Sequence, residues 1–322
     1  MFSNPYWYDG PIVNDEQFAG RQAQLQRCRE AVVQKGCLSL VGGPQSGLTS
    51  LLCRVASPRF RPDLGGEAES VRFLWVDCHQ FADPVDFIQH LLTELAPDGR
   101  VRIPPRWQPA FGQLIRALDG LQTAGARLVL LMDDFEGIGA SAKYIEFLDR
   151  FRSLTTRCEM SLITATHQLL KTCCHMSIAE SPFPNMFTVE FLGSFSTDEA
   201  MRFLERTSAT SGVDLTPYRE ELFALSGRMP YLLQMACARY FEALARGEAV
   251  SLHAVEDRIL EDAEPALRRI WDTMDNDSRT SLARLCTEGP TVPVSPVLVE
   301  KGYVNRDGIC SSVFSRFIVR ES

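Results

Sequence analysis

The stretch from Cys37 to Leu52 combines the residue types of a phosphate-binding loop. An apolar run is followed by a Gly/Pro/Ser turn and then by the start of a helix. The glycines and the threonine are spaced as G-x-x-x-x-G-x-T, a pattern that gathers backbone N–H groups and a helix N-terminus around a phosphate. A lysine belongs before the threonine, but the chain has Leu48 there. The expected nucleotide contacts are Gly42, Gly43, Pro44, Gln45, Ser46, Gly47, Leu48, Thr49 and Ser50.

The leucine at position 48 should affect catalysis more than nucleotide binding. Backbone donors do not depend on this side chain, so we expect the loop to hold a phosphate, and Thr49 can offer its hydroxyl to Mg²⁺. The missing lysine would neutralise charge that develops on the β- and γ-phosphates during transfer. Its loss is expected to lower the rate by a factor on the order of 10²–10³ or more. The sequence therefore predicts nucleotide binding with weak or no hydrolysis.

A second group of chemically capable residues follows the apolar run 128–132. In P-loop NTPases, an acid at the end of such a strand holds the metal and a neighbouring acid acts on the attacking water. We expect Asp133 to bind Mg²⁺ through water, and Asp134 or Glu136 to orient the attacking water. Thr164 or Thr166, at the end of the next apolar run, would sense the γ-phosphate.

The elements around these residues form an alternating pattern. Short apolar runs predict strands, and helical periodicity between them predicts helices, so the first part of the chain is expected to form a parallel sheet covered on both faces. The expected strands are 38–41, 71–76, 127–132, 161–164 and 189–192. From Ser196 the pattern is helical only, beginning with a capping box to Glu199, which predicts a small lid. Further helices and a hairpin around 302–313 predict a C-terminal winged helix.

Several motifs, taken in order, resemble bacterial AAA-like ATPases of the STAND (signal-transduction NTPase) and archaeal-ATPase-like group. The resemblance implies an α/β P-loop NTPase core at 1–193, a helical lid at 194–248 and a winged-helix domain at 249–322. The motifs besides the loop are Asn4-Pro5, Gly10-Pro11, Phe18 to Arg21, Asp133 to Glu136, Ser181 to Phe187, Leu192-Gly193, Ser226 to Gln234 and Val313 to Ile318. Leu48 departs from the group's pattern.

The resemblance also implies a ligand and a mode of action. Members of the group hold ATP or ADP between core and lid, switch conformation and often self-assemble. On this basis Phe18 to Arg21 and Pro230 would flank the adenine. Arg228 falls where some relatives place a phosphate-sensing residue, although a solvated surface arginine is an equal alternative.

Composition limits the remaining function classes. The net charge is −8, the hydrophobic content is 45%, and no apolar run reaches the roughly 20 residues of a membrane span. We therefore expect a soluble, cytoplasmic protein with no membrane partner. The ten cysteines contain no C-x-x-C pair and are expected to be reduced, and the five histidines have no metal-ligand spacing.

Three functional hypotheses follow. The first is a nucleotide-binding switch or scaffold that acts through protein partners or self-association, with a separate effector polypeptide. The second is an active ATPase in which another cation replaces the lysine. The third is a DNA-binding regulator. Residues 250–322 carry nine Lys/Arg against twelve Asp/Glu, a net charge of 9 − 12 = −3, so protein contact is favoured over nucleic acid.

Overall fold

The computed structural model describes residues 4–96 and 103–322, and the chain divides into two compact units. One, here called the sheet unit, comprises Ala23–Val41 and Leu51–Glu190. The other, here called the loop unit, comprises Met1–Gln22, Gly42–Ser50 and Phe191–Ser322. The residues of the phosphate loop therefore group with the C-terminal helices.

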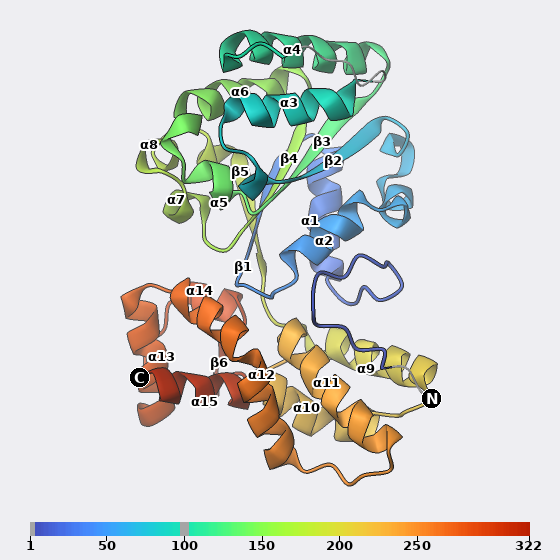
Figure 1. Ribbon diagram of the computed structural model, residues 1–322, viewed down its shortest axis with the longest axis vertical. Helices are drawn as coiled ribbons and strands as arrows, with labels where there is room; N and C mark the ends of the chain where they lie inside the picture. The colour runs from blue at the N-terminus through green and yellow to red at the C-terminus, as the bar shows by residue number, and fades with distance from the viewer. Residues whose placement is uncertain (1–3, 97–102) are drawn as a thin grey trace. The chain divides into compact units, whose positions relative to one another are not determined.

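A parallel five-stranded sheet forms the centre of the sheet unit, in the order β2-β3-β4-β1-β5 (Figure 1). The inner strands β1, β3 and β4 are buried along their whole length, which explains their continuous apolar sequences. Because β1, β4 and β3 are parallel neighbours, their carboxyl ends lie at one edge of the sheet. The strands are β1 (Cys37–Gly42), β2 (Val71–Asp77), β3 (Arg127–Asp133), β4 (Ser161–Thr166) and β5 (Phe187–Leu192).

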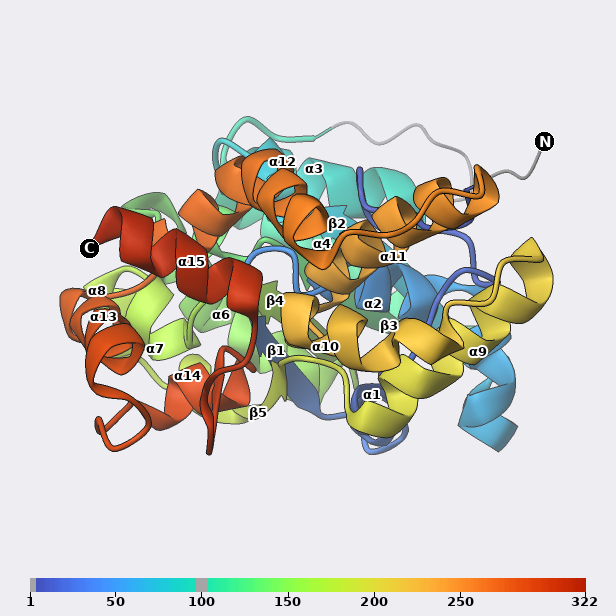
Figure 2. The ribbon, with the colours of Figure 1, turned by 90° about the horizontal axis from the view of Figure 1, so that it is seen from below.

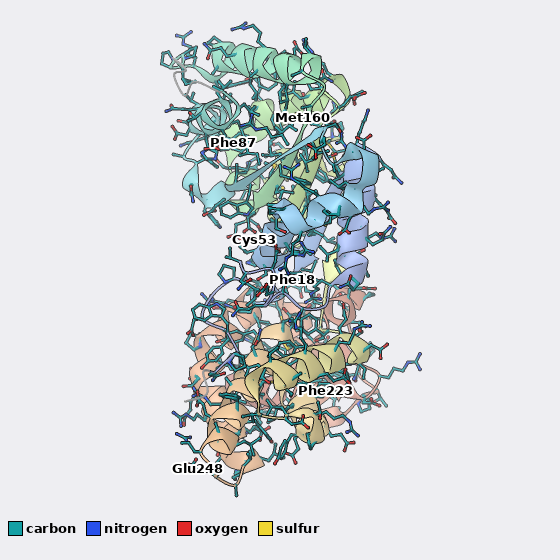
Figure 3. All side chains as sticks on the ribbon, turned by 90° about the vertical axis from the view of Figure 1, so that its right-hand side faces the viewer. Phe18, Cys53, Phe87, Met160, Phe223 and Glu248 are labelled. Atoms are coloured by element: carbon teal, nitrogen blue, oxygen red, sulfur yellow. The ribbon has the colours of Figure 1, made fainter. Side chains whose placement is uncertain are left out.

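Helices cover both faces of this sheet. One face packs against α3, α4 and α6 in a core that includes Phe87 and Met160 (Figure 3), and α1 and α2 lie on the other side (Figure 1). The α-helices are α1 (Gln22–Val33), α2 (Leu48–Ala56), α3 (Pro84–Leu95), α4 (Trp107–Thr123), α5 (Glu136–Gly139), α6 (Ile145–Arg157), α7 (Leu170–Cys173) and α8 (Met176–Ala179). The 3₁₀ segments are η1 (Pro58–Glu67), η2 (Cys78–Gln80), η3 (Ala142–Tyr144) and η4 (Pro184–Met186).

The loop unit is mainly helical, and a single hydrophobic core extends from α9 to α15. Figure 2 shows α10, α11, α12 and α15 gathered in this unit. Its elements are α9 (Thr197–Ser211), η5 (Thr216–Tyr218), α10 (Arg219–Ser226), α11 (Pro230–Ala245), α12 (Leu252–Asp272), α13 (Asn276–Glu288), α14 (Pro296–Glu300), β6 (Val304–Asn305), β7 (Gly308–Ile309) and α15 (Ser312–Glu321). The strands β6 and β7 form a short antiparallel pair.

The expected sheet is confirmed, with small differences at strand ends. The capping box at Ser196 and Glu199 is present at the start of α9. The fourth strand extends to Thr166, so Thr164 lies inside it and not at its end. The 3₁₀ segment Pro58–Glu67 carries two buried side chains, Phe60 and Leu64, which anchor it to the fold.

The ten cysteines are free thiols. Within the described residues, no helix has both the length and the apolarity that crossing a membrane requires.

Candidate functional site: the phosphate loop and the acidic strand ends

The phosphate loop connects the end of β1 at Gly42 to the start of α2 at Leu48. Gln45 and Gly47 have φ angles of 65° and 91°, and Ser46 N donates a hydrogen bond to Gly43 O at 3.1 Å. Left-handed residues in such a turn direct successive backbone N–H groups to one side and form a concavity for anions. The φ angles of Gln45 and Gly47 are compatible with phosphate binding, which remains a prediction for this loop.

The side chain at the lysine position contributes no charge to this concavity. Leu48 is the first residue of α2 and is only 6% exposed. A buried leucine offers packing and no charge, so position 48 adds nothing to the positive potential of the backbone dipoles. The geometry supports anion binding and provides nothing from position 48 for phosphoryl transfer.

The N-terminal segment supports the loop from two points. Arg21 Nη2 donates to Ser46 O at 2.8 Å, and its guanidinium stacks over the Phe195 ring, 4.9 Å from the centroid. Near the other end, Ile12 N donates to Ser50 Oγ at 2.9 Å. Burial lowers the pKa of Arg21 to about 10, against the opposing effect of the Glu199 carboxylate. The charged guanidinium of Arg21 thus binds a loop carbonyl and helps to fix the conformation of the loop.

A small cavity borders the loop within the same unit. Pro44, Gln45 and Ser46 line it together with Pro230 at the start of α11 and Tyr303 before β6. Its volume is about 10 Å³, enough for one water-sized group. The structure therefore brings together the loop and the predicted Pro230, and it adds Tyr303, which the sequence analysis missed.

Two other predicted contacts have different partners. Arg228 has a φ of 60°, and its Nη1 donates to Thr197 Oγ1 at 2.8 Å, in the first turn of α9. The carbonyl of Phe18 accepts from Arg206 Nη1 at 2.8 Å. Neither residue is part of the described lining of the cavity at the loop. Their proposed roles beside a nucleotide remain predictions.

The acidic residues lie in the sheet unit, at the carboxyl ends of β3 and β4. Asp133 ends β3 and is 3% exposed, whereas the Asp134 side chain is 41% exposed and its backbone has a φ of 46°. His167 follows β4; its Nε2 lies 3.9 Å from Asp134 Oδ1, and its backbone N donates to Glu136 Oε1. Glu136 is thus occupied on one oxygen by a structural bond, and Asp134 is the more accessible acid.

The negative charge at this end of the sheet contributes to raised pKa values of two nearby thiols. Burial raises the pKa of the Cys78 thiol well above its usual value, and the carboxylate of Asp133 adds to the shift. Burial likewise raises the pKa of Cys53, again with a contribution from Asp133. A concentration of carboxylates of this kind suits a hard cation with oxygen ligands such as Mg²⁺.

The predicted γ-phosphate sensors, Thr164 and Thr166, are fully buried in β4. Thr164 pairs with Ser39 of β1, and the two threonines are two residues apart, so all three hydroxyls lie on one face of the sheet. No described residue provides a hydrogen-bond partner for any of them. The sensing role remains a prediction for both threonines.

The residues offer a partial fit to Mg²⁺. No cluster of three or more His, Cys, Asp or Glu side chains in the described ranges is arranged to hold a metal ion. Magnesium at a phosphate loop takes most of its ligands from phosphate and water, so such a cluster is not required. The two predicted protein ligands, Thr49 and Asp133, belong to different compact units, and their joint role remains a prediction.

The family model for novel STAND NTPase 2 matches residues 77–290, well over half of the chain. The chain belongs to this family of STAND NTPases. The matched segment contains the acidic strand ends and the helices α9 to α12, and it begins after the phosphate loop. No curated protein matches the chain significantly.

Solved structures of P-loop ATPases share the fold. The Walker-type ATPase PABY2304 of Pyrococcus abyssi aligns with a TM-score of 0.64 and 15% identity, over 96% of this chain and 98% of that one. The ADP form of the Aeropyrum pernix ORC2 protein has a TM-score of 0.60 and 14% identity, over 92% and 80% of the two chains. The Aeropyrum pernix ORC1 protein in complex with DNA has a TM-score of 0.55 and 16% identity, over 99% and 87%.

His167 and Tyr303 are two residues near the predicted site that the sequence analysis missed. His167 had a usable signal, because it directly follows an apolar strand that neighbours the acidic one. Tyr303 had none, because it lies more than 250 residues from the loop in the sequence and no motif connects the two.

Proposed function

We propose that the protein is a nucleotide-binding switch that holds ATP or ADP at the loop 42–50, hydrolyses it slowly or not at all, and acts through protein partners or self-assembly. One observation carries the proposal: the loop has left-handed residues at Gln45 and Gly47, as anion-binding turns do, while the lysine position is a buried leucine. Backbone donors suffice to hold phosphate, and the missing cation affects mainly the transition state.

The other parts of the proposal rest on the resemblance and the relatives. We assign residues 194–248 as a helical lid and 249–322 as a winged helix, in line with the family's order of motifs and the short β6–β7 pair before α15. Adenine is the proposed base, since the Aeropyrum pernix ORC2 relative is described in an ADP form. Pro230 is the proposed lid contact, because it lines the cavity at the loop.

An active ATPase would need a cation in place of the lysine. Arg21 reaches the loop, but its guanidinium is engaged with Ser46 O and the Phe195 ring. Arg54, a second candidate, donates to Ser57 Oγ at 2.9 Å and to Arg59 O at 3.4 Å within its own segment. Slow or absent turnover is therefore favoured.

DNA binding is the weaker alternative, although one structural relative is described in complex with DNA. Two of the arginines that would carry it, Arg268 and Arg316, make ion pairs with acids of the same region. A DNA-binding face requires unneutralised positive charge toward the phosphates. Salt-dependent binding of a duplex by the intact chain would favour this alternative.

The decisive measurement is the thermal unfolding midpoint with and without Mg·ADP or Mg·ATP, together with release of phosphate from ATP. We expect either nucleotide at 100 times its Kd to stabilise the fold by about 2.7 kcal/mol, and phosphate release near background. An unchanged midpoint at millimolar nucleotide would contradict binding. Rapid turnover would contradict the switch in favour of an ATPase.

Two glycines provide a matched control. Gly47 and Gly125 have φ angles of 91° and 75°, and a methyl group at either position would meet no atom within 4 Å. Gly47→Ala and Gly125→Ala therefore carry the same kind of backbone strain, about 1–2 kcal/mol. Only the loop variant, Gly47→Ala, is expected to lose the nucleotide-induced shift.

A further inference from the structure

Tyr303 is an unusual neighbour for a phosphate loop. It is 3% exposed, and a Cβ at Gly43 would overlap its hydroxyl oxygen and lie 2.8 Å from its Cζ. The phenol thus rests against the loop backbone, in space that exists because residue 43 has no side chain. Together with Pro44 to Ser46 it lines the cavity of about 10 Å³.

The position of Tyr303 is fixed by close packing of backbone. A Cβ at Gly302 would overlap Ser194 N, and one at Gly193 would lie 2.5 Å from Glu300 O. Ser194 Oγ donates to Gly302 O at 2.9 Å, which joins the two segments. The tyrosine ring also packs against Phe314, with centroids 5.5 Å apart. Such packing holds the hydroxyl at the loop as part of the fold.

The hydroxyl of Tyr303 has no hydrogen-bond partner among the described residues, and neither has Ser46 Oγ on the loop itself. A buried polar group without a partner is destabilising, so natural proteins rarely keep one unless something else satisfies it. Burial raises the pKa of Tyr303 above its ordinary value, so the phenol is a protonated donor at neutral pH. The missing group is therefore an acceptor, at a place with room for about one oxygen atom.

We propose that Tyr303 is a phosphate ligand: its hydroxyl donates a hydrogen bond to a phosphate oxygen of the nucleotide held by the loop. This inference rests on the nucleotide binding proposed above and assigns the C-terminal region a direct part in it. The phenol is neutral, so it contributes affinity and geometry without replacing the charge of the absent lysine.

The test compares the chain with Tyr303→Phe, which removes one oxygen and keeps the ring. Calorimetric titrations use Mg·ADP, pyrophosphate and adenosine as probes. A hydrogen bond to a charged acceptor predicts about tenfold weaker binding of ADP and pyrophosphate, with adenosine unaffected. Without ligand, the unfolding midpoint should stay the same or rise, since an unsatisfied buried hydroxyl is removed.

Tyr6→Phe is the matched control. Tyr6 is also a buried tyrosine of the loop unit, and it packs against Phe203 and Phe241 with centroid distances of 5.8 and 6.1 Å. Its substitution should leave ADP binding unchanged.

Each contrary result has a distinct meaning. Equal or tighter ADP binding by Tyr303→Phe would overturn the phosphate contact while leaving the proposed function intact. A fall in ligand-free stability that matches the loss of affinity would identify a packing role and overturn it as well. Failure of the unmodified chain to bind ADP or pyrophosphate would overturn both proposals.

Discussion

The phosphate loop and the acidic strand ends use different chemical groups. The loop presents mainly backbone N–H groups. The position where the phosphate-loop pattern has a lysine is occupied by the uncharged Leu48. The ends of β3 and β4 present side chains instead, from Asp133, Asp134 and His167. A binding site made of backbone groups keeps its donors when most side chains are replaced. A site made of side chains loses or alters a functional group whenever one of those side chains is replaced. Binding and hydrolysis can therefore be separated by one residue.

The two regions also differ in what holds them in place. The acidic end is held mainly by backbone hydrogen bonds: Phe135 N donates to Ala165 O of the neighbouring strand at 3.1 Å, and Gly137 N donates to Asp134 O at 2.9 Å. The loop depends on residues far away in the sequence, with Arg21 bound to Ser46 O and Tyr303 against Gly43. Changes near the loop should therefore affect both stability and binding, and changes at the acids mainly turnover.

Gly43→Ala should have the largest effect. The new methyl group would overlap the Tyr303 hydroxyl, so the tyrosine or the loop must move. Overpacking of this kind costs about 1–3 kcal/mol, and we expect the ADP-induced shift in the unfolding midpoint to disappear. Gly10→Ala is the control, since its nearest atom, Trp7 Nε1, would lie at 3.9 Å. A stable Gly43→Ala protein with normal ADP binding would show that Tyr303 is not held against the loop.

Leu48→Lys should have the next largest effect, and it acts on turnover. If the acidic end retains its catalytic geometry, restoring the cation should raise phosphate release from ATP by a factor on the order of 10–10². Adding Asp134→Asn to Leu48→Lys should abolish the gain. Leu48→Met, which preserves the volume of the buried side chain, controls for packing. If Leu48→Lys folds and binds ATP without any gain in rate, the acidic end has lost its catalytic function too.

The sequence predicted the parts whose signals are local. The buried strands and the capping box at Ser196 each depend on residues within a few positions of one another, and the structure has both. The family assignment rests on the match of residues 77–290, which leaves out the phosphate loop.

The sequence analysis missed contacts between residues that are far apart in the sequence. Tyr303 follows a glycine in an ordinary turn sequence, and only folding brings it to Gly43. Arg21 was predicted beside the adenine, but its carbonyl partner on the loop was not foreseen. Contacts between positions far apart leave no trace in local periodicity, because periodicity reports only which face of an element is buried.

The smallest expected effect concerns the junction between the N-terminal segment and α9. Burial opposes ionisation of Glu199, but hydrogen bonds from the backbone N–H groups of Ser196, Arg21 and Gln22, together with the Arg21 charge, hold its pKa below the ordinary value. The unfolded chain therefore binds the proton more tightly. The contribution of Glu199 to stability is present above its unfolded pKa, near 4.3, and is lost as the pH falls through the lower folded pKa.

Glu199→Gln should flatten this dependence. Denaturant titrations between pH 7 and pH 3 should show the unmodified chain losing more stability than the variant over the acidic part of this range. Glu205→Gln, at an exposed position of the same helix, controls for the loss of one negative charge. Parallel pH profiles for the unmodified chain and Glu199→Gln would show that Glu199 does not hold the N-terminal segment. The support of the loop would then depend on Arg21 and Tyr303 without a contribution from Glu199.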